Sequence, residues 1–106
     1  MTTVYVRGTA RLDLIDRYVY FAENASVEIA ERFFVSAERS FEYLSRRSTI
    51  GAPLALSPPK LAGMRKWSVE GFGDVLIFYQ PRPDGVSIVR VLHAAQDWWG
   101  MLRVVT

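Results

Sequence analysis

Apolar and polar residues alternate at the start of the chain and then take up a helical period. Residues Thr3 to Arg7 alternate and are rich in valine and tyrosine, which predicts a short strand. From Thr9, a suitable N-cap, the spacing of apolar residues becomes that of a helix. The apolar face of this helix carries Leu14, Ile15, Tyr18, Phe21, Ala22 and Ala25, and the polar face carries Asp13, Asp16, Tyr20 and Glu23.

A second helix follows after a break at Asn24 to Ser26. Ser26 is a predicted N-cap, and the helix is expected to run from Val27 to about Arg47. Its apolar stripe consists of Val27, Ala30, Phe33, Phe34, Ala37, Phe41 and Leu44. Because the break is so short, the two helices are expected to form an antiparallel hairpin.

The second half of the chain has the pattern of a β-meander. Ser48 to Lys60 is expected to be a loop without regular structure, because it is rich in proline and glycine. Strands are predicted at Arg65 to Val69, Val75 to Gln80 and Val86 to His93. The connections between them are too short for parallel crossovers, so these strands should be antiparallel.

Together these elements predict an α+β fold in one domain over residues 1–106. An N-terminal strand precedes an antiparallel helical hairpin, which packs on a mainly antiparallel four-stranded sheet. Val75 to Tyr79 is apolar on both faces, which indicates a central strand covered on both sides.

Composition narrows the class of protein. The chain has no apolar run long enough to span a membrane, no signal-peptide pattern and no cysteine, so a cytoplasmic domain without disulfides is expected. The net charge of +2 is too small for a duplex-DNA binder. All of its cations except Lys60 and Lys66 are arginine, which suits an acidic protein partner or a nucleic-acid-associated target.

His93 is the one histidine, and its side chain can exchange protons near neutral pH. Asp97, four residues later, could orient it as a general base. The structural interpretation, which we favour, is that His93 ends a strand and caps the following turn. Arg90 lies in phase with apolar neighbours and needs a carboxylate or an anion, and the candidates within the chain are Asp97, Asp74 and Glu70.

A ribonuclease site would need a base, an acid and a cation beside one phosphate, and the available residues are His93, Arg65 and Arg90. Arg65 is more simply explained as a solvated charge, and no catalytic constellation is evident, which argues against catalysis. No motif for a cofactor or a metal is present either, so none is expected.

Tryptophans form a different kind of candidate site. Trp98 and Trp99 are adjacent and cannot both face the core from a short helix, so one should pack with Leu102 and the other should remain near the surface. Tryptophan is common at interface hot spots, so Trp67, Trp98 and Trp99 are candidate partner contacts, together with Arg65, Arg90, His93 and Asp97. Simple closure of the sheet face explains the tryptophan pair slightly better.

The order of several short motifs resembles the ParE branch of the RelE/ParE toxins of bacterial type II toxin–antitoxin systems. The resemblance extends from about Ala10 to Asp97 and departs from the family pattern at Arg17 and Gln96. It rests on Ala10, Asp13-Leu14, Tyr20, Ala30, Phe33, Leu44, Gly51, Pro53, Met64-Arg65, Val69, Gly71-Phe72, Ile77-Phe78-Tyr79, Arg90-Val91-Leu92-His93 and Asp97.

The resemblance implies a helical hairpin on a sheet and a ParD-like antitoxin that wraps the toxin in a hetero-oligomer. ParE-type toxins are associated with poisoning DNA gyrase, whereas RelE-type relatives cleave mRNA on the ribosome. The tail of this chain matches the ParE branch better, so a non-enzymatic gyrase inhibitor that binds no specific nucleic-acid sequence by itself is expected. A RelE-like ribonuclease and an inactive member that binds only antitoxin remain the alternatives.

Overall fold

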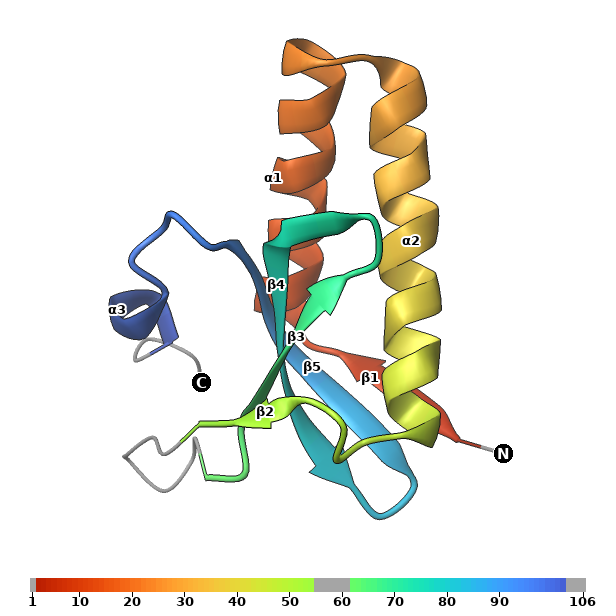
Figure 1. The fold of residues 1–106 in the computed structure, drawn as a ribbon, viewed down its shortest axis with the longest axis vertical. Coiled ribbons are helices and arrows are strands. Elements are labelled where there is room, and N and C mark those ends of the chain that lie inside the picture. The colour runs from red at the N-terminus through yellow and green to blue at the C-terminus, as the bar shows by residue number, and fades with distance from the viewer. Residues whose placement is uncertain (1, 55–61, 103–106) are drawn as a thin grey trace.

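A computed structural model describes residues 2–54 and 62–102 of the chain. The elements, in chain order, are β1 (Thr3–Val6), α1 (Gly8–Asn24), α2 (Val27–Arg46), β2 (Ala52–Pro53), β3 (Arg65–Val69), β4 (Phe72–Arg82), β5 (Gly85–His93) and α3 (Trp98–Leu102). Figure 1 shows α1 and α2 side by side as an antiparallel hairpin that extends past the sheet. The α+β fold predicted from the sequence is therefore confirmed.

The sheet has five strands in the order β1-β5-β4-β3-β2. Only β1 and β5 are parallel, and the strands from β2 to β5 pair antiparallel, as the short connections required. The predicted number of four strands was wrong, because Ala52–Pro53 pairs with Lys66 and Arg65. A proline is tolerated there because β2 is an edge strand. Residues 55–61 of the predicted loop lie outside the described residues.

Helix α2 begins as its sequence predicts, and α1 does not. The Ser26 hydroxyl accepts a hydrogen bond from the Ile29 N–H, which is the expected N-cap of α2. Helix α1 begins at Gly8, one residue before the predicted cap, and the side chain of its N-cap residue Arg7 makes no capping bond. The Thr9 hydroxyl instead donates to the Val89 carbonyl oxygen, 3.2 Å away, and so connects α1 to the sheet.

Each face of the sheet has its own apolar cluster. The hairpin covers one face, where Leu14, Phe33 and Phe41 pack on the strands. On the other face, Leu102 of α3 packs with Met64, Phe78 and other buried residues. The central strand β4 is therefore covered on both sides, as its apolar sequence predicts. Within the described part of the chain, no helix is long and apolar enough to cross a membrane.

Candidate functional site

Strand β5 is longer than its neighbour β1, and side chains of α1 complete its edge. Beyond Ile88, where pairing with β1 ends, the Val89 carbonyl oxygen accepts the hydroxyl proton of Thr9. The Val91 N–H donates to the Asp13 carboxylate at 2.9 Å. Thr9 and Asp13 lie one helical turn apart on α1, so both reach the strand from the same face of the helix.

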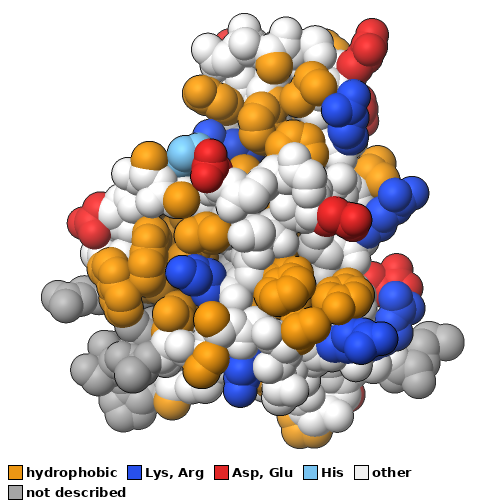
Figure 2. Space-filling view, in the orientation of Figure 1, with side chains coloured by type: hydrophobic (Ala, Val, Ile, Leu, Met, Phe, Trp, Pro, Cys, Tyr) orange, Lys and Arg blue, Asp and Glu red, His pale blue; other side chains and the backbone are white. Residues whose placement is uncertain are grey.

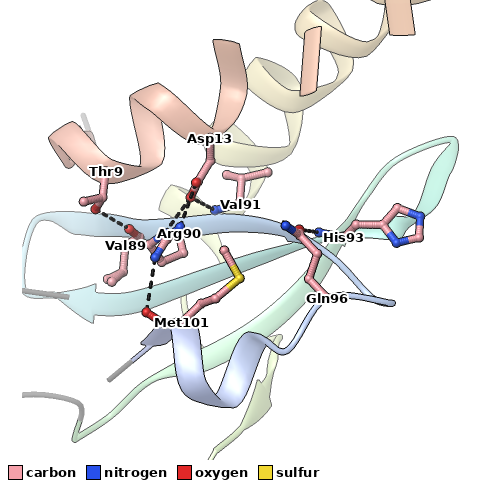
Figure 3. A network of polar contacts seen from close by, with 8 residues as sticks. All are labelled: Thr9, Asp13, Val89, Arg90, Val91, His93, Gln96 and Met101. Carbon is pink, nitrogen blue, oxygen red and sulfur yellow. Dashed lines mark hydrogen bonds and ion pairs between the residues drawn. The ribbon is translucent and has the colours of Figure 1, made fainter. Parts of the chain in front are cut away.

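The same carboxylate holds Arg90 in a two-point ion pair. Arg90 Nε and one terminal nitrogen donate to the two Asp13 oxygens at 2.7 and 2.9 Å, and its other terminal nitrogen donates to the Met101 carbonyl oxygen at 3.2 Å (Figure 3). Arg90 is 8% exposed. Its hydrogen bonds to Asp13 raise the pKa of Arg90 above its ordinary value, against the lowering effect of burial.

The predicted partners of Arg90 and the predicted position of Asp13 were wrong. Asp97, Asp74 and Glu70 were the candidates, and Asp13 was placed on the solvent side of its helix. A register shift between Phe78 and Tyr79 changes the alternation of β5, so Arg90 does not share a face with Val86 and Ile88. Helix α1 crosses the open end of the strand and brings Asp13 to it.

His93 has the structural role that the sequence analysis favoured. Its Nδ1 accepts a hydrogen bond from the Ala95 N–H at 3.0 Å, and its own backbone N–H donates to Gln96 Oε1 at 2.6 Å. Asp97 does not act on the imidazole through these contacts, because its carboxylate accepts the Gly100 N–H within α3. In Figure 3 the His93 side chain points away from Arg90, consistent with their opposite alternation on β5.

Arg65 lies far from His93 along the sheet, and it is not a free, solvated charge. It donates to the carbonyl oxygens of Thr49 and Gly51 at 2.9 and 2.7 Å, so it clamps the segment that follows α2. Arg65 pairs with Tyr79 on β4 and His93 pairs with Val75, which are separated by about 13 Å along that strand. The fold therefore does not bring the three residues proposed for ribonuclease chemistry together.

Trp98 and Trp99 form an aromatic surface on the face opposite the hairpin. Their rings stack with centroids 4.2 Å apart, and Trp98 also packs on Phe78 at 5.2 Å. The Lys66 ammonium lies 5.5 Å from the Trp98 ring centroid, and Trp99 remains 49% exposed. Hydrophobic side chains gather over α3 around a Lys or Arg in Figure 2. One tryptophan packs inward and the other stays near the surface, as predicted.

Trp67 belongs to a different surface. It packs against the hairpin side of the sheet, where its ring stacks on Tyr43 of α2 at 6.1 Å. The three tryptophans proposed as partner contacts therefore divide between two faces of the sheet. A partner that contacts Trp98 and Trp99 would have to reach around the sheet to touch Trp67.

Sequence reasoning missed an apolar groove along the hairpin, next to β1. Ile15 and Phe34 were placed with the apolar faces of their helices, but they are 53% and 40% exposed. The sheet covers only one side of the hairpin, and Ile15 and Phe34 lie on the part of the apolar stripes that the sheet does not cover. The groove has a volume of about 650 Å³ and is lined by Val4, Val6, Arg11, Leu14, Ile15, Phe34, Glu38, Phe41 and Glu42. The sequence signal for the groove was that the apolar stripes of the two helices are wider than the face that one sheet can bury.

The sequence matches a known protein family over most of its length. Residues 4–98 match the family model described as the ParE toxin of the type II toxin–antitoxin system parDE. The chain belongs to the ParE toxin family. It is thus, by family, the toxin component of a type II toxin–antitoxin system, which agrees with the resemblance in its sequence motifs. No curated protein sequence matches the chain significantly.

Solved structures share the fold of this ParE family member. A chain from the chromosomal ParDE system of P. aeruginosa superimposes with a TM-score of 0.69 and 17% identity, covering 88% of this chain and 96% of that one. A chain from the YoeB–YefM complex of Staphylococcus aureus gives a TM-score of 0.51 and 14% identity, with 88% and 97% covered. At these identities the likeness establishes the fold alone.

Proposed function

We propose that this ParE family member is a toxin that inhibits DNA gyrase by binding, in the cytoplasm, and that it is not an enzyme. The observation that carries the proposal is the use of its polar side chains. Arg65, Arg90 and His93 are each engaged in hydrogen bonds within the protein, and they lie apart. The exposed Trp99 and its stacked neighbour offer a contact surface instead.

We further propose that a ParD-like antitoxin neutralises the toxin through the hairpin groove. Most of the residues that line the groove are apolar, and the charged ones are Arg11, Glu38 and Glu42. Such a groove suits an amphipathic helix that inserts its apolar face. The structural match to a ParDE system is consistent with a partner of this kind.

A supercoiling assay with purified gyrase tests the target. The wild-type chain is expected to block supercoiling or to trap cleaved DNA, and Trp99→Ala is expected to weaken this effect. Phe34→Asp serves as the matched control, because it removes an exposed aromatic ring from the groove and leaves the Trp98–Trp99 surface intact. Wild-type protein without effect on gyrase would rule out the proposed target.

The same two variants test the antitoxin site, with the expected loss now in Phe34→Asp instead of Trp99→Ala. Co-purification with the product of the adjacent reading frame, if that frame encodes a ribbon-helix-helix protein, should be lost for Phe34→Asp and kept for Trp99→Ala. If both variants bind the antitoxin as the wild type does, the groove is not its site.

Ribonuclease activity is the alternative function, and an assay in a translation extract distinguishes it from gyrase inhibition. We expect intact transcripts with the wild-type chain. Codon-positioned cuts that disappear in His93→Ala would overturn the non-enzymatic proposal. Absence of both toxicity and cuts on induced expression would instead point to an inactive member that binds antitoxin alone.

A further inference from the structure

We infer that Arg90 is a positioning residue that holds the Trp98–Trp99 pair in place, and not itself a contact for the partner. The sequence analysis counted it among the partner contacts. Arg90 is almost completely buried, and its guanidinium is directed at Asp13 and Met101 (Figure 3). The inference rests on the proposed function only for the identity of the molecule that the tryptophans contact.

The guanidinium joins three elements of the fold. From β5 it reaches the Asp13 carboxylate of α1 through two donors and the Met101 carbonyl oxygen of α3 through a third. A guanidinium is planar and its donors have fixed directions, so the position of Asp13 determines where the third donor points. Asp13 is itself fixed by the Val91 N–H of the strand. The location of Met101 is thus coupled to α1 and β5.

Helix α3 depends on such external contacts. It has five residues, which is too short for a helix to be stable without tertiary packing. Its own polar contacts are local, since the Gly100 N–H and the Met101 N–H both donate to Asp97. Leu102 and Trp98 attach it to the sheet by apolar packing, which constrains rotation of the helix less than a directed hydrogen bond does. Arg90 supplies that directed bond.

The position of α3 on the sheet fixes Trp98, whose ring packs on Phe78 at 5.2 Å. Trp99 stacks on Trp98 with the ring centroids 4.2 Å apart, so the position of Trp98 also sets the position of the pair. A surface that is already ordered before binding loses less entropy when a partner docks. Arg90 therefore contributes to binding by preorganising the pair.

Near-ultraviolet circular dichroism of the purified chain tests the inference directly. Tryptophan rings that are held in one fixed arrangement give a strong near-ultraviolet signal. The part of this signal that Trp99→Phe removes is assigned to the stacked pair and is called the paired signal. Arg90→Lys keeps the charge but cannot maintain the two-point pair and the bond to Met101 together. We expect it to lose the paired signal while its far-ultraviolet spectrum stays that of the wild type.

A second variant and a control keep the inference testable if Arg90→Lys fails to fold. The double substitution Asp13→Leu with Arg90→Met removes both charges, so that neither is left buried without a partner. It should also lose the paired signal, whereas Glu42→Gln, which removes the exposed ion pair with Arg46, should retain it. A folded Arg90 variant with the wild-type paired signal would overturn the inference.

The two proposals fail separately in this design. The dichroism measurement uses the free protein and needs no gyrase, so it decides the role of Arg90 even if gyrase is not the target. If the wild-type chain does inhibit gyrase, Arg90→Lys should lose inhibition to the same extent as Trp99→Ala. Full inhibition by an Arg90 variant would overturn the positioning role in function.

Discussion

At the scale of single residues, the Asp13–Arg90 pair is expected to have a large effect on stability. Both side chains are about 10% exposed, and they join at 2.7 Å. Removal of one partner from such a pair leaves a buried charge without compensation. The Glu42–Arg46 pair has almost the same length, 3.0 Å, but its side chains are 66% and 60% exposed. The two pairs therefore differ in their expected contribution to stability because of burial and not because of distance.

The first prediction compares these two pairs. Asp13→Ala is expected to lower the free energy of unfolding by about 3–5 kcal/mol, because Arg90 and the Val91 N–H both lose their acceptor. Glu42→Ala should lower it by no more than about 0.5 kcal/mol, since water screens that pair. Urea unfolding of both variants provides the measurement. Equal effects would contradict the prediction that burial of the Asp13–Arg90 pair increases its contribution to stability.

Tyr79 gives a prediction about pH. Its hydroxyl oxygen accepts the Gly51 N–H at 2.9 Å in the core, and burial raises the pKa of Tyr79, although Gly51 and Arg65 lower it in part. The folded state favours the protonated phenol. The contribution of Tyr79 to the free energy of unfolding is therefore fully present below pH 10, the ordinary pKa of tyrosine, and is lost at higher pH. Stability of the wild type should therefore fall above about pH 10.

Tyr79→Phe isolates this contribution. The variant leaves the buried Gly51 N–H without its acceptor, so it should be less stable by about 1–3 kcal/mol at neutral pH. Its stability should also fall less steeply between pH 9 and 11, which denaturant titrations at several pH values can measure. An unchanged slope would assign the alkaline effect to the other tyrosines, such as Tyr5 and Tyr18, whose pKa values are raised by hydrogen bonds to carboxylates.

At the scale of elements, the attachment of β1 to β5 depends on one glycine. Gly85 begins β5 directly after the turn, has a φ of 155° and pairs with Thr3. A Cβ at this position would lie 1.8 Å from the Thr3 carbonyl oxygen, which is backbone and cannot move aside without moving the strand. Since β1 leads into α1, the same glycine also affects the start of the hairpin.

The corresponding prediction has a matched glycine control. Gly85→Ala is expected to destabilise the fold by on the order of 3 kcal/mol and to release β1, visible as faster amide exchange in residues 3–6. Gly73→Ala, where a Cβ has open space around it, should change stability by less than about 1 kcal/mol. Protection of β1 that survives Gly85→Ala would mean that the strand is held by other contacts.

At the scale of the whole molecule, the sheet separates two exposed apolar regions. The hairpin groove lies on one side and the Trp98–Trp99 pair on the other. Exposed apolar patches can mark surfaces that bind a partner. The arrangement would allow one protein to be bound at the hairpin while the tryptophan pair is still exposed.

The groove leads to a prediction about solubility. The free chain should aggregate and become soluble on co-expression with its antitoxin, because a bound helix would cover Ile15 and Phe34. Ile15→Lys combined with Phe34→Glu should raise the soluble fraction of the free chain without a loss of stability, since both side chains are already exposed. Light scattering at matched concentrations measures this, and unchanged aggregation would place the responsible surface elsewhere.

The sequence by itself determined the helical hairpin, the strands β1, β3, β4 and β5, and their order, but not the edge strand β2. The apolar periods of α1 and α2, the Ser26 cap and the short connections between strands are local features, and they act within a few residues of one another. The structural role of His93 was also predictable, because its partner Ala95 is two residues away. Local geometry is encoded in local sequence, so pattern analysis recovers it.

Only the tertiary structure decided the partner of Arg90, the clamp made by Arg65 and the groove. Arg90 and Asp13 are 77 residues apart, and a register shift in β5 together with the crossing of α1 brings them into contact. Arg65 reaches carbonyl oxygens of a segment whose path no side-chain pattern predicts. The exposure of Ile15 and Phe34 depends on where the sheet ends. These contacts depend on long-range packing, in which elements from distant parts of the chain share one surface, and no local pattern contains that information.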